Sequence, residues 1–482
     1  LKYIIYAFIH FIYSCNFHQT SENMKAFFEE QKSRVEKALS SGFVEAAKMT
    51  DTVSKYVENQ QRKISMDINS YVESVKQDGR NFADSWSYLP TEEPEARMEQ
   101  PDKILSVPAT IVRNGYNCET HTVISQGYIL NLHRISHPKG KIVISKKTIL
   151  LQHGLFASSA DWILNGPEKG LAYVLANAGY DVWMSNVRGN KYSREHAWLK
   201  NSSKSYWNFS WHDIALHDIP AIIDYIISVK GNPEITYIGH SMGTTILFAM
   251  LTLRPEYNSI LKAAFAVAPV VFLSDIKSPI KSLAPIASKV AYMEMLYGSH
   301  EFLPKKSALG RISSSCNIDN LESMACKNAI FYICGYNEKQ LNKTLLPVFM
   351  KNLGTGTSWK TAVHFSQEII AGGKFQQFDY ESNNQRVYNS DIPPEYDLSR
   401  VTLPIILVWA ENDLLSSEKD VKRLYEKLPS TTKIYKVPDP EFNHLDYLWA
   451  IDAPKLLNDK IMEYLNDIYK EPSVFFNFHI GK

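Results

Sequence analysis

Ser241 lies in the sequence Gly-His-Ser-Met-Gly, between Gly239 and Gly243, directly after the strand-like run Ile235–Ile238. A serine in this setting becomes a nucleophile when the chain turns sharply from a strand into a helix and a base stands beside it. Glycines on both sides relieve the crowding where strand and helix nearly touch. The pattern predicts a nucleophile elbow with Ser241 at its tip; the alternative is a glycine-rich loop with an idle serine.

A base must follow the serine and its acid along the chain, because triads on this kind of sheet run in the order serine, acid, histidine. Beyond Asp413 the chain has two histidines, His444 and His479. His479 belongs to an aromatic C-terminal tail, with nothing after it to anchor a loop. His444 follows the strand-like residues 433–437 and precedes a helical pattern. The sequence therefore predicts His444 as the base.

The acid is expected at the end of a buried strand, because catalytic groups of parallel sheets gather at the carboxyl ends of the strands. The apolar stretch Pro404–Ala410 is such a strand, and Glu411-Asn-Asp413 follows it directly. Asp413 is the predicted acid. Glu411 is one alternative, and Asp446, which lies close to His444 in sequence, is a second.

Acyl transfer also requires N–H donors for the developing oxyanion. One is expected from the backbone of Met242, the residue after the nucleophile. The other is expected from Leu155, which follows Gly154 after the strand-like stretch Thr148–Gln152. Gly154 would permit a close backbone approach, although it could equally be an ordinary turn at a strand end.

The elements that position these residues alternate between strand and helix patterns. Such alternation predicts an α/β fold with a mostly parallel central sheet and helices on both faces. Residues 271–398 interrupt the alternation with helices and loops rich in Lys, Ser and Tyr, and we interpret them as an insertion above the sheet. The expected strands are 148–152, 180–185, 235–238, 263–268 and 403–410, and the expected helices 170–178 and 217–229.

Before the core, residues 28–75 repeat apolar positions at steps of three, four or seven, which indicates an amphipathic helix or helix pair. A Pro- and Glu-rich stretch at 88–96 then predicts a linker. The expected division is a signal peptide (1–20), a helical extension with linker (21–100), the first core part (101–270), the insertion (271–398), the second core part (399–470) and a tail (471–482).

The charge and cysteine content of the chain argue against two classes of function. The 482 residues carry 52 Lys and Arg against 51 Asp and Glu, so no basic excess indicates a nucleic-acid partner. No Cys/His spacing typical of a metal site occurs, and the predicted chemistry requires no cofactor. The oligomeric state is left open.

The first twenty residues contain an eleven-residue apolar run, which is too short to span a bilayer and fits a signal peptide; a buried N-terminal helix or strand is the alternative. Entry into the secretory pathway would make sequons at Asn201, Asn208 and Asn342 glycan acceptors. Localisation is therefore expected to be secreted or lysosomal.

Several long motifs make the chain similar to one family, the acid lipases of the α/β-hydrolase superfamily, which includes lysosomal acid lipase and gastric lipase. The similarity extends from about residue 104 to residue 462. Its motifs are GYILNLHRI (127–135), LLQHGLFASSADWI (150–163), GYDVWMSNVRGNKYSR (179–194), YIGHSMGTT (237–245), KFQQFDY (374–380) and FNHLDYLWAIDAP (442–454).

The resemblance implies a lipase that cleaves acylglycerols or sterol esters through an acyl-serine, with transient contact to lipid surfaces. It implies Ser241, Asp413 and His444 as the triad, Leu155 and Met242 as oxyanion donors, and a helical cap with a lid at 271–398. It also implies a Cys316–Cys326 disulfide that leaves Cys334 free. The alternatives are a hydrolase-like lipid-binding protein without catalysis, or an esterase or thioesterase for smaller substrates.

Three departures from the family pattern are the N-terminal helical segment, Ser-Met-Gly in place of the usual Ser-Gln-Gly, and the altered sequence after Asp413. The stretch 302–333 mixes apolar with basic and polar residues and is the expected lid; an ordinary cap helix with one buried face is the alternative.

Overall fold

The computed structural model describes residues 105–136, 147–231, 233–282, 284, 301–302, 328, 330–353 and 355–470. These belong to one of the chain's two compact units, which comprises residues 1–7 and 104–482. The predicted signal peptide, helical extension and C-terminal tail with His479 lie outside the described residues, as does nearly all of the predicted lid. Of the helices that are described, none is long and apolar enough to cross a membrane.

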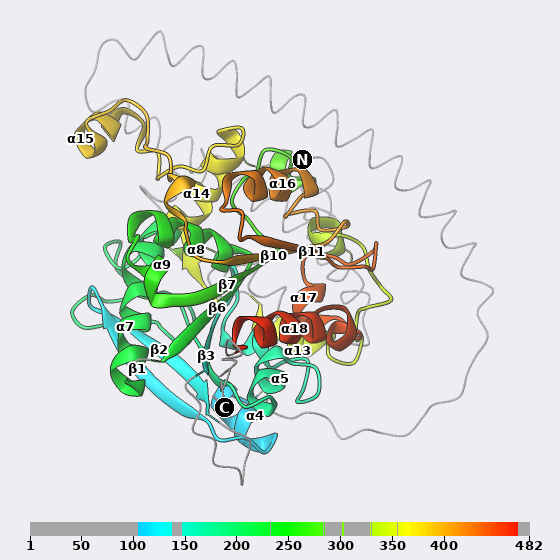
Figure 1. Ribbon diagram of the computed structural model, residues 1–482. Helices are drawn as coiled ribbons and strands as arrows, with labels where there is room; N and C mark the ends of the chain where they lie inside the picture. The colour runs from blue at the N-terminus through cyan, green and yellow to red at the C-terminus, as the bar shows by residue number, and fades with distance from the viewer. Residues whose placement is uncertain are drawn as a thin grey trace, which may run out of the picture. The chain divides into compact units, whose positions relative to one another are not determined.

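A nine-stranded sheet forms the centre of the unit, in the order β1-β2-β4-β3-β6-β7-β10-β11, with β5 paired to β2 (Figure 1). Within this sheet, β4, β3, β6, β7, β10 and β11 pair with one another in parallel. The hairpin β1–β2 and the pairs of β2 with β4 and with β5 are antiparallel. The predicted α/β fold is confirmed. The strands are β1 (Glu119–Ser125), β2 (Tyr128–Ile135), β3 (Lys147–Gln152), β4 (Asp181–Met184), β5 (Glu195–His196), β6 (Glu234–His240), β7 (Leu261–Val267), β10 (Ile405–Trp409) and β11 (Lys433–Lys436).

Helices cover both faces of the sheet, because successive side chains of a strand point to opposite sides. Leu150 of β3 packs in one core with α7, α8 and α16, while its neighbours Ile149 and Leu151 pack in a second core with α4, α5, α17 and α18. Figure 1 shows α5 and α18 on one side of the strands and α7 and α9 on the other. The helices are α4 (Val107–Arg113), α5 (Leu171–Asn177), α6 (Trp211–Asp213), α7 (Ile219–Lys230), α8 (Met242–Leu253), α9 (Tyr257–Ile260), α16 (Glu418–Lys427), α17 (Asp446–Trp449) and α18 (Asp459–Ile468).

The central strands are buried on both faces, which explains their continuous apolar sequences. In β10 all five residues are buried, and in β3 only the first residue is exposed. The antiparallel hairpin of β1 and β2 was not among the predicted strands. Its outer strand, β1, has intermediate or exposed residues at five of seven positions, so its sequence lacks the apolar run that marks a buried strand.

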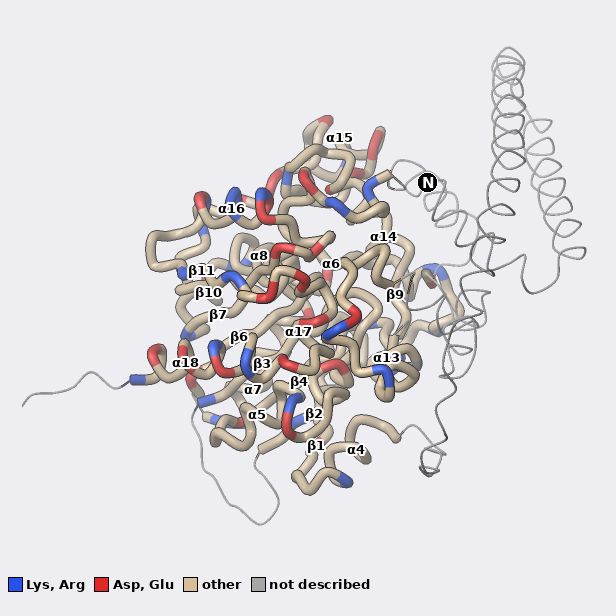
Figure 2. The backbone as a smooth tube through the Cα atoms, turned by 90° about the vertical axis from the view of Figure 1, so that its right-hand side faces the viewer, with Lys and Arg blue, Asp and Glu red and all other residues tan. Residues whose placement is uncertain are grey.

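The insertion between β7 and β10 contains described helices α13 (Leu346–Asn352), α14 (Trp359–Ile370) and α15 (Asn384–Tyr388). The sequence predicted no strands in this insertion. That prediction is wrong, because the structure contains a small antiparallel pair, β8 (Glu301–Phe302) with β9 (Thr357–Ser358). Strands of two residues are too short for a periodic sequence pattern. Lys/Arg and Asp/Glu are interspersed along the described backbone in Figure 2, in keeping with the balanced charge.

Candidate active site

The turn at Ser241 joins the end of β6 to the start of α8. Ser241 has φ 53° and ψ −120°, a strained backbone conformation for a residue other than glycine. Its N–H donates to the carbonyl of Val267 on the neighbouring strand β7, at 3.0 Å, which holds the turn against the sheet. The strand–turn–helix context predicted from the sequence is therefore present.

The two flanking glycines lie where α8 and the strands approach most closely. A Cβ on Gly239 would lie 2.8 Å from the carbonyl carbon and oxygen of Gly243, and a Cβ on Gly243 would lie 2.5 Å from the backbone oxygen of Gln152. Real Cβ atoms essentially never come within 3.0 Å of such groups. Both positions therefore require glycine for the turn to form.

Ser241, His444 and Asp413 are brought together from three separate loops. His444 Nε2 lies 2.8 Å from Ser241 Oγ, and His444 Nδ1 lies 3.0 and 2.9 Å from the two carboxylate oxygens of Asp413. A carboxylate only accepts hydrogen bonds, so Nδ1 carries the proton. Nε2 is then the nitrogen that can accept the proton of the serine hydroxyl.

Asp413 is fully buried, and its charge is stabilised by backbone donors as well as by His444. Its Oδ1 accepts hydrogen bonds from the N–H groups of Leu415 at 2.9 Å and Ser416 at 2.8 Å. The two alternative acids are placed elsewhere. Glu411 forms an exposed ion pair with Lys436 at 2.6 Å, and Asp446 accepts hydrogen bonds from residues other than the His444 ring.

Leu155 and Met242 both line the cavity that contains Ser241, about 330 Å³ in volume. Met242 is the first residue of α8, and the first N–H groups of a helix have no acceptor within it. Among the backbone hydrogen bonds of the described residues, none is donated by Leu155 or Met242. Both N–H groups are thus available for an oxyanion.

The loop that carries Leu155 approaches Ser241 closely, as a glycine at 154 permits. A Cβ on Gly154 would lie 3.1 Å from Ser241 Cβ. His153 fixes this loop, because its Nδ1–H donates to the Gly154 carbonyl at 2.8 Å while its Nε2 accepts from the N–H of Val187 at 3.3 Å. Burial lowers the pKa of His153 to about 4, so the ring is neutral and keeps one donor and one acceptor.

His240 was not singled out in the sequence, although it precedes the nucleophile. Its Nε2–H donates to the backbone carbonyl of His444 at 3.0 Å, so it links the elbow to the loop of the predicted base. Burial, with the nearby His444 as a smaller cause, lowers the pKa of His240 to about 3. The signal that could have identified it is its position as the last residue of the buried strand β6, directly before Ser241.

The walls of the cavity around Ser241 are mostly aliphatic and aromatic. They come from the loop that carries Leu155, from the segment after β7, from the middle of the insertion, and from the loops of Asp413 and His444 with α17. The start and end of the predicted lid meet the described structure here: Phe302 stacks on Phe156 with ring centroids 5.5 Å apart, and Ile330 lines the cavity. Apolar lining residues include Leu155, Phe156, Val270, Leu273, Ile276, Ile330, Ile333, Phe365 and Trp449.

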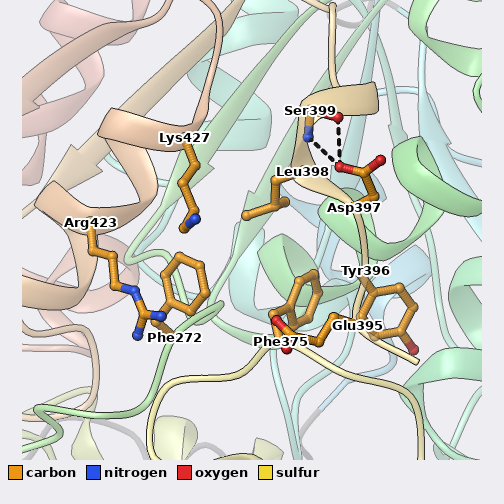
Figure 3. A pocket seen from close by; sticks show the side chains of 9 residues that line it. All are labelled: Phe272, Phe375, Glu395, Tyr396, Asp397, Leu398, Ser399, Arg423 and Lys427. Atoms are coloured by element: carbon orange, nitrogen blue, oxygen red, sulfur yellow. Dashed lines mark hydrogen bonds between the residues drawn. The ribbon is translucent and has the colours of Figure 1, made fainter. Parts of the chain in front are cut away.

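A second cavity of about 390 Å³ shares no lining residue with the first. Figure 3 shows its charged groups on two sides, with Arg423 and Lys427 of α16 opposite Asp397. Asp397 accepts hydrogen bonds from the N–H and hydroxyl of Ser399 at 3.0 and 2.6 Å. Among its described lining residues, no serine or cysteine is hydrogen-bonded to a histidine, so we place the candidate active site at Ser241.

The remaining predicted sites have different outcomes. Asn201 and Asn208 are exposed and Asn342 is half-buried. Cys316 and Cys326 lie outside the described residues, and Cys334 is a buried free cysteine. Within the described ranges, no group of three or more His, Cys, Asp or Glu side chains has the arrangement of a metal site.

Comparison with known proteins identifies the family of the chain. Residues 147–450 match the family described as alpha/beta hydrolase fold, and residues 107–166 match the partial alpha/beta-hydrolase lipase region. The chain is 37% identical to Lipase 1 of Drosophila melanogaster over 384 residues, which cover 78% of this chain and 84% of that protein. It is 34% identical to gastric triacylglycerol lipase of Rattus norvegicus over 370 residues, covering 76% of this chain and 92% of that protein.

The fold and the matched family define an α/β-hydrolase. The chain belongs, within that superfamily, to the acid lipases, as its sequence motifs predicted, and it is a carboxylic ester hydrolase of the lipase class.

Proposed function

We propose that the protein hydrolyses water-insoluble carboxylic esters, acylglycerols or sterol esters, through an acyl-serine on Ser241. The observation that carries this proposal is the combination of the Ser241–His444–Asp413 hydrogen-bond chain with an almost wholly apolar cavity at the serine. Such a cavity suits a fatty acyl chain, because burying apolar surface supplies ~25 cal/mol per Å². The relatives named as gastric triacylglycerol lipases support the same substrate class.

In the proposed reaction, Ser241 Oγ bonds to the ester carbonyl carbon as its proton passes to His444 Nε2. The carbonyl oxygen becomes an oxyanion and accepts hydrogen bonds from the N–H groups of Leu155 and Met242. His444 gives the proton to the alcohol oxygen as the C–O bond breaks, which leaves the acyl-serine. Water, activated by His444, then releases the fatty acid. Asp413 orients His444 and stabilises its positive charge, and no step requires a metal or cofactor.

The finer assignments belong to the same proposal. The chain would enter the secretory pathway by residues 1–20, carry glycans at Asn201, Asn208 and Asn342, and act in a secreted or lysosomal setting. Residues 271–398 would form the cap and lid, stabilised by a Cys316–Cys326 disulfide, and would contact lipid surfaces transiently. The exposure of Asn201 and Asn208 supports glycosylation there.

Fatty acid release from triolein, a cholesteryl oleate emulsion and a short soluble ester tests the proposal, with Ser241→Ala as the control. We expect Ser241-dependent release from at least one emulsified substrate, at a rate above that on the soluble ester. Activity confined to the soluble ester would favour the esterase alternative. Binding of the emulsion without any hydrolysis would favour the lipid-binding alternative.

A further inference from the structure

The residues Cys334–Leu341, which we name the cap clamp, belong to the cap insertion but lie against the loops that carry Asp413 and His444. One oxygen joins the two loops: the carbonyl of Cys334 accepts the N–H of Leu414 at 3.4 Å and the N–H of His444 at 3.2 Å. Leu414 directly follows the acid. The backbone of the Asp413 loop and the backbone of the His444 loop are therefore both held by the cap clamp.

Gly335 allows the cap clamp to come this close. It has φ 113°, and a Cβ there would collide with the backbone oxygen of Asn412 and lie 3.0 Å from Asn443 Cβ. The Gly335 carbonyl accepts the side-chain N–H of Asn443 at 3.0 Å. The clamp thus contacts the residue directly before His444.

The next contact is buried and involves the carboxyl group of Asp446. Asn337 is 1% exposed, and its Nδ2–H donates to Asp446 Oδ2 at 2.8 Å. The same Oδ2 accepts the backbone N–H of Asn443 at 2.8 Å. Asn443 Oδ1 in turn accepts the N–H groups of Leu445 and Asp446, at 2.8 and 3.1 Å. The two residues that flank His444 are therefore tied into one network with Asn337.

We propose that Asn337 and Asp446 are positioning residues that hold the His444 loop at the distance from Ser241 and Asp413 that catalysis requires. Neither residue contacts the imidazole ring through a hydrogen bond, so their effect passes through the backbone of the loop. This inference rests on the proposed triad. It assigns a part of the cap insertion, which was expected to cover the site, to the catalytic geometry itself.

Exchange of the two side chains provides the test. Asn337→Asp removes the amide donor that Asp446 accepts and puts a second carboxyl group in its place, which repels Asp446 when both are ionised. In the double variant Asn337→Asp with Asp446→Asn, the new amide donates to the new carboxylate, while its oxygen still accepts the N–H of Asn443. Lys339→Gln is the matched control, because the Lys339–Glu441 ion pair, 2.8 Å long and exposed, joins the same two segments.

On a short soluble ester we expect Asn337→Asp to lower kcat by at least ~10-fold with KM within about twofold, since an error near 1 Å can cost ~10² in rate. The double variant should recover to within about threefold of wild type, and Lys339→Gln should match wild type. If Asn337→Asp does not fold, Asn337→Ser removes the same donor without adding charge and should lower kcat in the same way.

Normal kcat in folded Asn337→Asp or Asn337→Ser would overturn the inference. So would a double variant that regains the wild-type Tm but not kcat, because the pair would then be only structural. Failure of the proposed function would give a different result, because the wild type itself would then show no Ser241-dependent hydrolysis.

Discussion

Gly243→Ala tests whether the turn at Ser241 depends on the close packing of α8 against β3. The new Cβ would lie 2.5 Å from the backbone oxygen of Gln152 and 3.2 Å from that of His153. Ordinary contact begins at 3.4 Å, so α8 and β3 must separate by about 0.9 Å to go from 2.5 to 3.4 Å. Both contact atoms belong to backbone and cannot rotate away as a side chain could.

This shift acts directly on the proposed oxyanion site, because Met242 belongs to α8 and Leu155 follows His153 in the chain. A displacement near 1 Å in a catalytic group costs ~10²-fold in rate. Overpacking of this kind costs about 1–3 kcal/mol in stability. We therefore expect kcat on a soluble short-chain ester to fall by ~10² or more while most of the protein remains folded.

The assay combines kcat and KM on that ester with thermal unfolding of the same preparation. Gly231→Ala is the control: Gly231 ends α7 with φ 64°, and nothing lies within 4 Å of a Cβ there. Left-handed strain should cost it about 1–2 kcal/mol and leave kcat unchanged. A folded Gly243→Ala enzyme with kcat within twofold of wild type would refute the reasoning.

Three further predictions concern other parts of the chain. A protein that starts near residue 100 should still cleave a soluble ester; an inactive but folded truncation would contradict this. Deletion of 303–327, which stops before the cavity residue Ile330, should impair emulsified long-chain esters far more than a soluble ester, and equal loss would make the segment scaffold. Burial raises the pKa of Asp161 to about 7, so its folded-state pKa exceeds the ordinary 3.8. Wild-type stability should therefore fall relative to Asp161→Asn between about pH 4 and 7, by up to ~4 kcal/mol, and parallel Tm curves from pH 4 to 8 would contradict this.

The parts of the site that could be predicted from sequence are those with a local pattern. Ser241 and Asp413 each follow a run of buried strand residues, and the carboxyl ends of parallel strands meet at one edge of the sheet. His444 could be placed by its order in the chain and by the strand-like residues before it. A local pattern was sufficient for Ser241 and Asp413, because each follows a buried apolar strand. His444 depended on chain order, since the strand before it, β11, is largely exposed.

The supporting residues could not be predicted, because their partners are distant in sequence. Asn337 and Asp446 are 109 positions apart, and their contact follows from the path of the cap insertion. The exclusion of the two alternative acids required the structure, which places Glu411 in an exposed ion pair with Lys436 and Asp446 against Asn337. The β1–β2 hairpin escaped prediction because its outer strand is largely exposed.

The role of Ser241 as nucleophile is tested most directly by covalent labelling with a long-chain p-nitrophenyl phosphonate, followed by peptide mass spectrometry and measurement of residual ester hydrolysis. We expect one phosphonyl group per chain, on Ser241, with activity lost in proportion to labelling and no labelling of Ser241→Ala. Loss of activity with Ser241 unmodified, or full activity with Ser241 fully labelled, would contradict that role.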